Sequence, residues 1–256
     1  MNALQTSLRW TGAAAGLAAG AYAGYVGVTW ARYGNPARPG PDEQDELLDR
    51  FIPDYDVVER HHIRVAATAA MTLAVAREMD PFDGPLIRAV FRGRGLILGA
   101  TPEQRPRRDG LLATMQSLGW VVLAETPEHE IVVGAVTRPW EADVTFRSIP
   151  AEAFAAFNEP DYVKIVWTLR ADPIDAATSI FRTETRAVAT SADARVKFRR
   201  YWSFLSPGIW LIRRLMLGPL KAEAERTRAN AAHIAARRRD EPSASPLHRR
   251  EVRGHD

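Results

Sequence analysis

Cysteine is absent from the 256 residues, and lysine is scarce. Without cysteine the chain can form neither disulfides nor thiolate metal sites, and it has no cysteine nucleophile. Arginine supplies nearly all the positive charge, because the lysines are limited to Lys164, Lys197 and Lys221. The formal net charge of +3 is small, and no nucleic-acid recognition motif is present. We therefore expect no nucleic-acid partner.

Motifs for nucleophilic catalysis, cofactors and metals are also missing. No G-x-S-x-G sequence marks a nucleophilic serine. Gly93-Arg94-Gly95 lacks both the preceding strand and the third glycine that a dinucleotide-binding loop requires. His61 and His62 are adjacent, and neighbouring residues of a strand point to opposite faces, so the two imidazoles cannot share a metal ion. The sequence predicts no cofactor and no metal site.

Charge is absent from one long stretch, the twenty-two residues 10–31, WTGAAAGLAAGAYAGYVGVTWA. At 1.5 Å per residue, about twenty apolar residues match the roughly 30 Å hydrocarbon core of a bilayer. Trp10 and Trp30 stand at its ends, where aromatic rings favour the headgroup layer. The pattern predicts a membrane anchor over residues 1–33, and hence a single-pass membrane protein.

The flanks of this stretch bear on its orientation and on one alternative. Arg32 and Arg38 follow it, whereas Arg9 alone precedes it, and this bias weakly favours a cytoplasmic body. Residues 21–23, Ala-Tyr-Ala, also fit the small-residue site of a cleaved signal peptide. The segment is therefore interpreted as an anchor, with a signal peptide as the alternative.

Composition divides the rest of the chain into three parts. Residues 34–54 combine proline, glycine and a run of acids, which predicts an extended linker. Residues 55–236 contain the periodic segments of one domain. Residues 237–256 are rich in arginine without periodicity, which is typical of a disordered tail.

The body reads as strands followed by a long helix. A two-residue alternation and intervening turns predict strands at 55–67, 119–125, 130–137, 144–149, 162–171 and 178–189. Short helices are expected at 68–80 and 85–94, and a helical turn at 150–158. From Thr190 onward apolar residues recur every three or four positions, with interruptions expected at Pro207 and Pro219. The arginines of this helix, Arg213 and Arg214 included, are interpreted mainly as a solvated face.

An antiparallel sheet with one apolar face must cover that face, and the striped C-terminal helix is the obvious cover. This predicts an α+β fold. The element order and the passage FRTETRAVATSADARVKFRRYWSFLSPGIWLIRR together resemble the START-like (SRPBCC) superfamily and its helix-grip fold, over residues 55–225. The resemblance implies a cavity between sheet and helix that holds a lipid, sterol, polyketide or other apolar molecule. It also implies that cyclase or dehydratase chemistry occurs among the relatives.

Glu59 and His61 form the candidate catalytic pair. They share one face of the first strand with Val57, Ile63 and Val65, and their side chains lie about 6–7 Å apart along it. A carboxylate beside an imidazole is the minimal equipment for general acid–base catalysis. The alternative is that both lie in solvent or in an ordinary ion pair with a neighbouring arginine.

Large side chains on the sheet face and on the helix stripe are the candidate ligand-binding residues. Rings on a sheet face usually fill a core, but in a helix-grip fold they would line the cavity. The set comprises Trp140, Trp167, Phe181, Thr183, Thr185, Phe198, Trp202 and Leu205. The sequence thus predicts a membrane-anchored domain that binds an apolar small molecule or lipid. A cyclase or dehydratase-type enzyme and a protein-binding scaffold are the alternatives.

Overall fold

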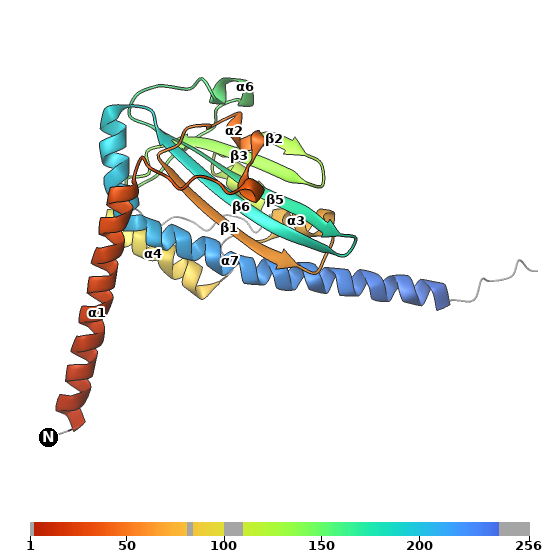
Figure 1. Ribbon diagram of the computed structural model, residues 1–256, viewed down its shortest axis with the longest axis horizontal. Coiled ribbons are helices and arrows are strands. Elements are labelled where there is room, and N and C mark those ends of the chain that lie inside the picture. Colours follow the sequence, from red (N-terminus) through yellow and green to blue (C-terminus); the bar gives the residue numbers. More distant parts are fainter. Residues whose placement is uncertain (1–2, 81–83, 100–109, 241–256) are drawn as a thin grey trace, which may run out of the picture.

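Six antiparallel strands form one sheet, in the computed structural model that describes residues 3–80, 84–99 and 110–240. The order across the sheet is β1-β6-β5-β3-β2, and the two-residue β4 pairs with β3. The strands are β1 Val57–Val65, β2 Val121–Thr126, β3 Glu130–Thr137, β4 Phe146–Arg147, β5 Val163–Asp175 and β6 Thr178–Ala189. The first strand of the sheet therefore pairs with the last, which brings the two ends of the domain together (Figure 1).

The helices lie around this sheet, and the longest one crosses a face of it (Figure 1). They are α1 Ala3–Arg32, α2 Glu46–Asp49, α3 Ala69–Glu78, α4 Pro85–Leu98, α5 Leu111–Ser117, α6 Ala151–Phe154 and α7 Ala192–Asp240, with a 3-10 turn at Pro41–Glu43. The α+β class and the antiparallel sheet with a long C-terminal helix are confirmed. The short helix α5 was not predicted from the sequence.

Alternation along the strands produces an inner face, directed at α7, and an outer face. On β1 the inner face carries Val57, Glu59 and His61, which pair in register with Ala187, Thr185 and Thr183 of β6. Further along, the inner face packs against α3, α5 and α7 in the main hydrophobic core. That core includes Val65, Leu73, Leu111, Ile131, Val133, Trp167, Leu169, Phe181, Leu217 and Leu220.

The outer face carries a second core, so it is not simply the wet side of the sheet. Leu48, Phe51 and Ile52 cover it together with Phe154 of α6, and all four are buried. The Asp45 side chain begins α2 by accepting a hydrogen bond from the Leu48 amide at 2.9 Å. Residues 34–54, predicted as an extended linker, thus include a segment that packs on the sheet.

Helix α7 continues through both prolines but changes direction. Figure 1 shows its first part, in cyan, standing at a steep angle to its long second part, in blue. Pro207 and Pro219 lie inside the helix, and proline removes a backbone hydrogen bond and kinks a helix. The helix extends to Asp240, four residues into the predicted tail, whose remainder (241–256) is outside the described residues. Residues 101–110, TPEQRPRRDG, are expected from the sequence to form a loop, and all but Gly110 lie outside the described residues.

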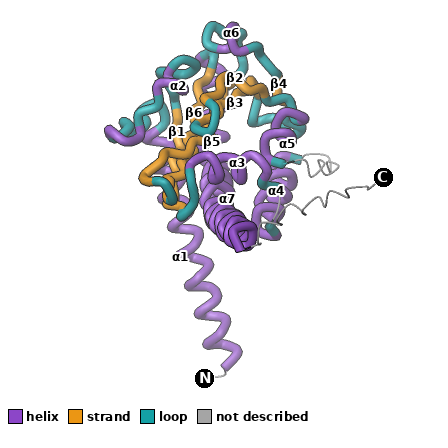
Figure 2. The backbone as a smooth tube through the Cα atoms, turned by 90° about the vertical axis from the view of Figure 1, so that its right-hand side faces the viewer, coloured by secondary structure: helices purple, strands orange, loops and turns teal. Residues whose placement is uncertain are grey.

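Helix α1 contacts the body only near its C-terminal end. Tyr22 donates a hydrogen bond to the Phe204 carbonyl at 2.8 Å, and two donors of Arg199 bond the Trp30 carbonyl. The rest of α1 projects away from the domain, with Trp10 and Leu17 exposed (Figures 1 and 2).

The predicted membrane span at 10–31 is wrong, and so is the single-pass membrane localisation derived from it. Within the described ranges, no helix is apolar enough over a sufficient length to cross a bilayer. Helix α1 has the length, at thirty residues. It lacks the hydrophobicity, because thirteen of the twenty-two residues 10–31 are alanine (eight) or glycine (five). Alanine and glycine side chains contribute little apolar surface.

Candidate functional site

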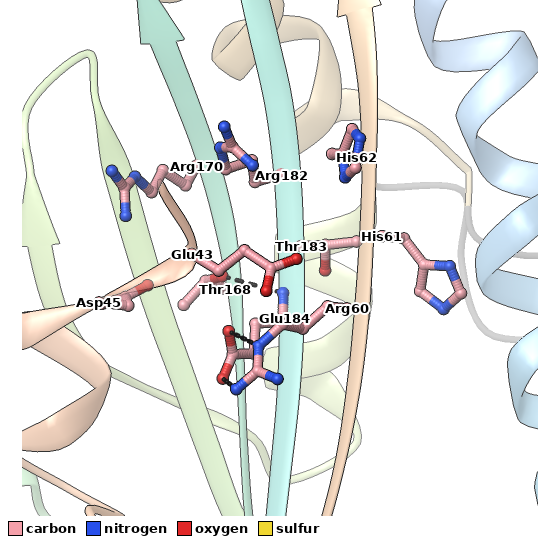
Figure 3. A pocket seen from close by; sticks show the side chains of 10 residues that line it. All are labelled: Glu43, Asp45, Arg60, His61, His62, Thr168, Arg170, Arg182, Thr183 and Glu184. Carbon is pink, nitrogen blue, oxygen red and sulfur yellow. Dashed lines mark hydrogen bonds and ion pairs between the residues drawn. The ribbon is translucent and has the colours of Figure 1, made fainter. Parts of the chain in front are cut away.

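Glu59 and His61 both lie on the inner face of β1. Figure 3 shows the His61 ring directed toward α7, while Arg60 and His62 leave the strand on the other side. The Nε2 atom of His61 is 3.7 Å from Oε2 of Glu59. The imidazole is 7% exposed and the carboxylate 19% exposed. The structure therefore brings the candidate catalytic pair together under the helix, with neither side chain in bulk solvent.

Two buried polar atoms at this place have no hydrogen-bond partner in the described part of the chain. They are Nε2 of His61 and Oγ1 of Thr183, and the two residues are opposite each other in the β1–β6 register. Buried polar atoms in native proteins are nearly always satisfied by protein, water or ligand. These two unpaired atoms on the inner face therefore indicate a position where a small polar group could form hydrogen bonds.

Burial dominates the protonation of the pair. It raises the pKa of Glu59 to about 7, although the positive charge of Arg213 opposes the change. Burial also lowers the pKa of His61 to about 4, and the charges of Arg213 and Arg214 add to this. Near pH 7 the imidazole is neutral and the carboxyl group is partly protonated, so the 3.7 Å contact is not an ion pair. Shifted pKa values of this kind are common at functional sites.

Arg213 is the functional candidate that the sequence reading placed wrongly. It was interpreted as part of a solvated face, but its guanidinium carbon lies 5.0 Å from the Trp167 ring centroid. Burial lowers its pKa to about 10, which leaves it positively charged at pH 7. The helical spacing in the sequence does predict its inward position. Arg213 follows Ile209 by four positions and precedes Leu217 by four, so it occupies the apolar stripe of α7.

A narrow cavity of about 20 Å³, roughly the space that one water molecule needs, lies between the sheet and α7. Thr183 and Arg213 are its polar side chains. The apolar lining comes from α3, α5, β5, β6 and α7: Ala76, Met79, Leu111, Leu169, Phe181, Met216, Leu217 and Leu220. Pockets for drug-sized ligands usually range from about 300 to 1,000 Å³, so the cavity is closed to such a ligand as it stands. A ligand would need the flexible Met79, Met216 and Arg213 side chains to move aside.

The structure separates the predicted ligand-binding residues into two groups. Phe181 and Thr183 line the cavity, Trp167 packs in the same core, and Thr185 is buried on the inner face. The other cluster lies beyond the cavity, near the end of α1. Phe198 and Trp202 are buried in it, and Trp140 packs at its edge. Leu205 is half-buried and belongs to neither core.

A second hollow lies on the outer face and is lined mainly by charged side chains (Figure 3). These charges are already paired. Arg60 bonds Glu184 at 2.9 Å, and Arg170 and Arg182 bond the two oxygens of Asp172 at 2.7 and 2.8 Å. A ligand would have to break these pairs, so the inner cavity is the better candidate site. Across the described residues, no group of three His, Asp or Glu side chains is suited to hold a metal ion.

Glu59→Gln should raise the free energy of unfolding at pH 8 by about 2–3 kcal/mol. The carboxyl group has its ordinary pKa near 4.5 when unfolded and about 7 when folded, so it destabilises the fold as pH rises from 4.5 to 7. Glutamine removes that titration. Urea unfolding at pH 4 and pH 8 measures it, and the gain should vanish at pH 4. A similar change at exposed Glu152 should alter stability by about 0.5 kcal/mol or less at both pH values. An equal gain at pH 4 and pH 8 would contradict the assignment.

Comparison with protein-family models and with curated proteins gives no match. Among solved structures, a hypothetical protein from Helicobacter pylori is 7% identical, with a TM-score of 0.37, over 73% of this chain and 99% of that one. A norcoclaurine synthase mutant from Thalictrum flavum, in complex with a transition-state analogue, is 11% identical, with a TM-score of 0.33, over 67% and 95%. An aromatase/cyclase from Streptomyces sp. R1128 is 14% identical, with a TM-score of 0.21, over 66% and 93%. At such values function has to be inferred from the chain's own residues.

Proposed function

We propose that this chain is a START-like (SRPBCC) domain that binds an apolar small molecule or lipid between its sheet and α7. One observation carries the proposal: an apolar cavity is lined by the buried Oγ1 atom of Thr183, which bonds nothing in the described part of the protein, and by the charged side chain of Arg213. An apolar lining with a few convergent polar groups is what small-molecule sites share.

The walls of the cavity are suited to admit such a ligand. Met79 and Met216 are unbranched and adapt to irregular shapes, so they can vacate space at little energetic cost. The opposite wall is rigid, because Leu169 and Phe181 stand on the central strands β5 and β6. Because the helical wall of the cavity can adapt while the sheet wall stays fixed, the cavity can accept ligands of different shapes.

Blocking the cavity should abolish binding of a neutral apolar dye. Ala76 lines the cavity from α3 and is fully buried, whereas Ala74 on the same helix is exposed. We expect Ala76→Met to weaken Nile red binding by about tenfold or more, with a loss of about 1–3 kcal/mol in stability from overpacking. Ala74→Met should change neither. Fluorescence titration of the full-length chain measures the affinity, and native mass spectrometry detects any co-purified ligand.

Two results would overturn the binding proposal. One is an absence of both dye binding and co-purified ligand in the unmodified protein. The other is unchanged dye binding by Ala76→Met. Either would favour the alternative that the domain is a protein-binding scaffold with a filled core.

A second candidate function is an acid–base enzyme of the cyclase or dehydratase type. The observation that favours it is the proximity of Glu59 and His61, with a neutral imidazole beside a carboxyl group that titrates near pH 7. In that case His61→Asn should retain dye binding and lose turnover of a cyclisable substrate. Turnover that survives both His61→Asn and Glu59→Gln would exclude this pair from catalysis.

A further inference from the structure

We propose that the ligand of the inner cavity is an anionic amphiphile, an apolar body that ends in a carboxylate, and that Arg213 binds the carboxylate. The inference rests on the proposed binding function and adds the chemical class of the ligand. It follows from the position of one positively charged side chain, that of Arg213. Arg213 faces the cavity from the middle of α7, and the side chains around it there are almost all apolar.

The guanidinium of Arg213 has no hydrogen bond or ion pair with any described residue. Its contact is with the face of the Trp167 ring, at 5.0 Å. Other arginines that leave solvent in this protein are paired directly. Arg186, at 1% side-chain exposure, bonds Glu184 and Asp49, and Arg60 bonds Glu184. Arg213 is half-buried among apolar side chains, and Glu59 acts on it without forming an ion pair, so a bound anion would stabilise its positive charge.

The geometry around Arg213 selects a carboxylate. A guanidinium presents several N–H donors in a planar fork, which matches the two oxygens of a carboxylate. The stacking on Trp167 fixes one face of the guanidinium and leaves the edge with the donors available. Thr183 lines the same cavity with an unpaired hydroxyl, which adds a further donor. The apolar residues of the lining then take the hydrocarbon part of the ligand.

Glu59 is the carboxylate whose charge acts on Arg213, but the two form no ion pair. A bound anion would neutralise the guanidinium that now favours the ionised form of Glu59. The pKa of Glu59 should then rise above 7, and binding should take up a proton. Affinity for the anion should consequently fall as pH rises above 7. Arg213 of α7 is the charged group that acts on Glu59, and Arg213, Arg214 and His62 act on the neighbouring His61.

The test compares three probes that share a twelve-carbon chain, on the full-length protein by isothermal titration calorimetry: laurate, 1-dodecanol and dodecyltrimethylammonium. We expect laurate to bind about 10- to 100-fold more tightly than dodecanol, which is the range of a charge-assisted hydrogen-bonded pair. Arg213→Met should reduce this preference to about threefold or less and leave dodecanol binding in place. Arg213→Lys, which keeps the charge without the fork, should retain part of the preference.

Arg214→Met is the matched control, because Arg214 is the next residue of α7 and is exposed. It should keep the laurate preference. Dodecanol binding without any preference for laurate would overturn this inference and leave the proposed function standing. Failure of all three probes to bind would overturn the proposed function itself. Equal loss of preference in Arg213→Met and Arg214→Met would show attraction by general surface charge and would overturn the Arg213 site.

Proton uptake supplies a second readout. Laurate titrations at pH 8 in two buffers with different ionisation enthalpies should reveal uptake in the unmodified protein and none in Glu59→Gln. The Glu59→Gln protein should also bind laurate with the same affinity at pH 6.5 and pH 8. Uptake that persists in Glu59→Gln would overturn the coupling of Glu59 to Arg213.

Discussion

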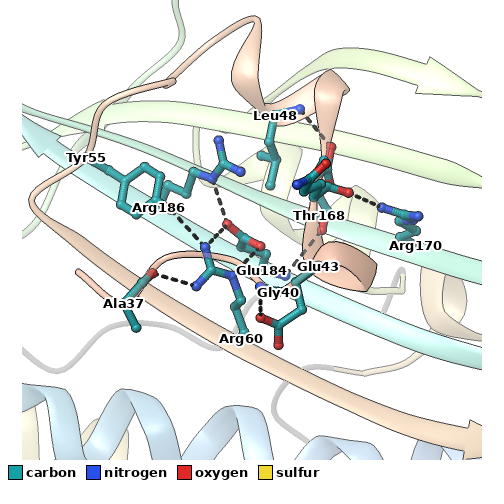
Figure 4. A network of polar contacts seen from close by, with 12 residues as sticks. Ala37, Gly40, Glu43, Leu48, Tyr55, Arg60, Thr168, Arg170, Glu184 and Arg186 are labelled. Atoms are coloured by element: carbon teal, nitrogen blue, oxygen red, sulfur yellow. Dashed lines mark hydrogen bonds and ion pairs between the residues drawn. The ribbon is translucent and has the colours of Figure 1, made fainter.

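Glu184→Gln should lower the free energy of unfolding by about 3 kcal/mol, because it leaves two arginines facing each other at a buried site. The carboxylate of Glu184 lies between Arg60 and Arg186 and bonds them at 2.9 and 2.7 Å (Figure 4). Glutamine is neutral and of nearly equal size, so the change removes charge without removing packing. The loss falls at the lower end of the range for a broken buried pair, because Arg186 also bonds Asp49 and the Ile52 carbonyl.

The matched control is Glu159→Gln. Glu159 also bonds an arginine through two oxygens, but that pair with Arg147 is about half exposed on both sides. Exposed pairs contribute about 0–1 kcal/mol, so the control should unfold almost as the unmodified protein does. Urea unfolding of both variants at pH 7 makes the comparison. Equal losses for the two would contradict the view that the outer-face network is buried and structural.

This network shows what alternation along one strand can and cannot predict. The pattern in β6 correctly places Arg182, Glu184 and Arg186 on one face, opposite Phe181 and Thr183. Charges that alternate in sign along one strand face favour a solvent-exposed surface when the sequence is considered alone. In the structure Arg186 is fully buried, because the side chains that cover it come from a separate segment. Strand periodicity identifies which residues share a face, but not what packs on that face.

The covering segment was hard to read for a physical reason. Its apolar residues Leu48, Phe51 and Ile52 follow a run of acids and prolines, and α2 is only four residues long. A helix that short shows no 3.6-residue period. The burial depends on tertiary contact with the outer face, such as the edge-to-face packing of Phe51 on Phe154 at 6.2 Å. Composition alone therefore favoured a linker.

The inner face was predicted more fully, because two independent patterns agree there. Alternation in β1 places Glu59 and His61 inward, and the stripe of α7 places Phe198 and Trp202 inward. Arg213 was missed because charge was given more weight than position on the stripe. A long side chain with a charged end can occupy an apolar face when it stacks on a ring, as Arg213 does on Trp167.

Trp202→Ala should lower the free energy of unfolding by about 3–5 kcal/mol, the usual loss when a large buried ring is removed. Trp202 is 7% exposed and packs 5.9 Å from the Phe198 ring, in the cluster with Val57, Val163 and Ala187. A buried tryptophan removes on the order of 200 Å² from water. Trp210→Ala on the same helix is the control. Its side chain is 46% exposed, so its loss should stay below about 1 kcal/mol.

The same variant separates the two groups of candidate ligand residues. Trp202 belongs to the cluster beside α1, whereas the cavity is lined by Phe181, Thr183 and Arg213. Trp202→Ala should therefore leave Nile red affinity within about twofold under conditions where the protein stays folded, although it is the more damaging change to stability. Thermal unfolding and dye titration on one preparation measure both effects. A loss of dye binding at small cost in stability would instead show that the cavity extends along α7 to Trp202, and that this ring contacts the guest.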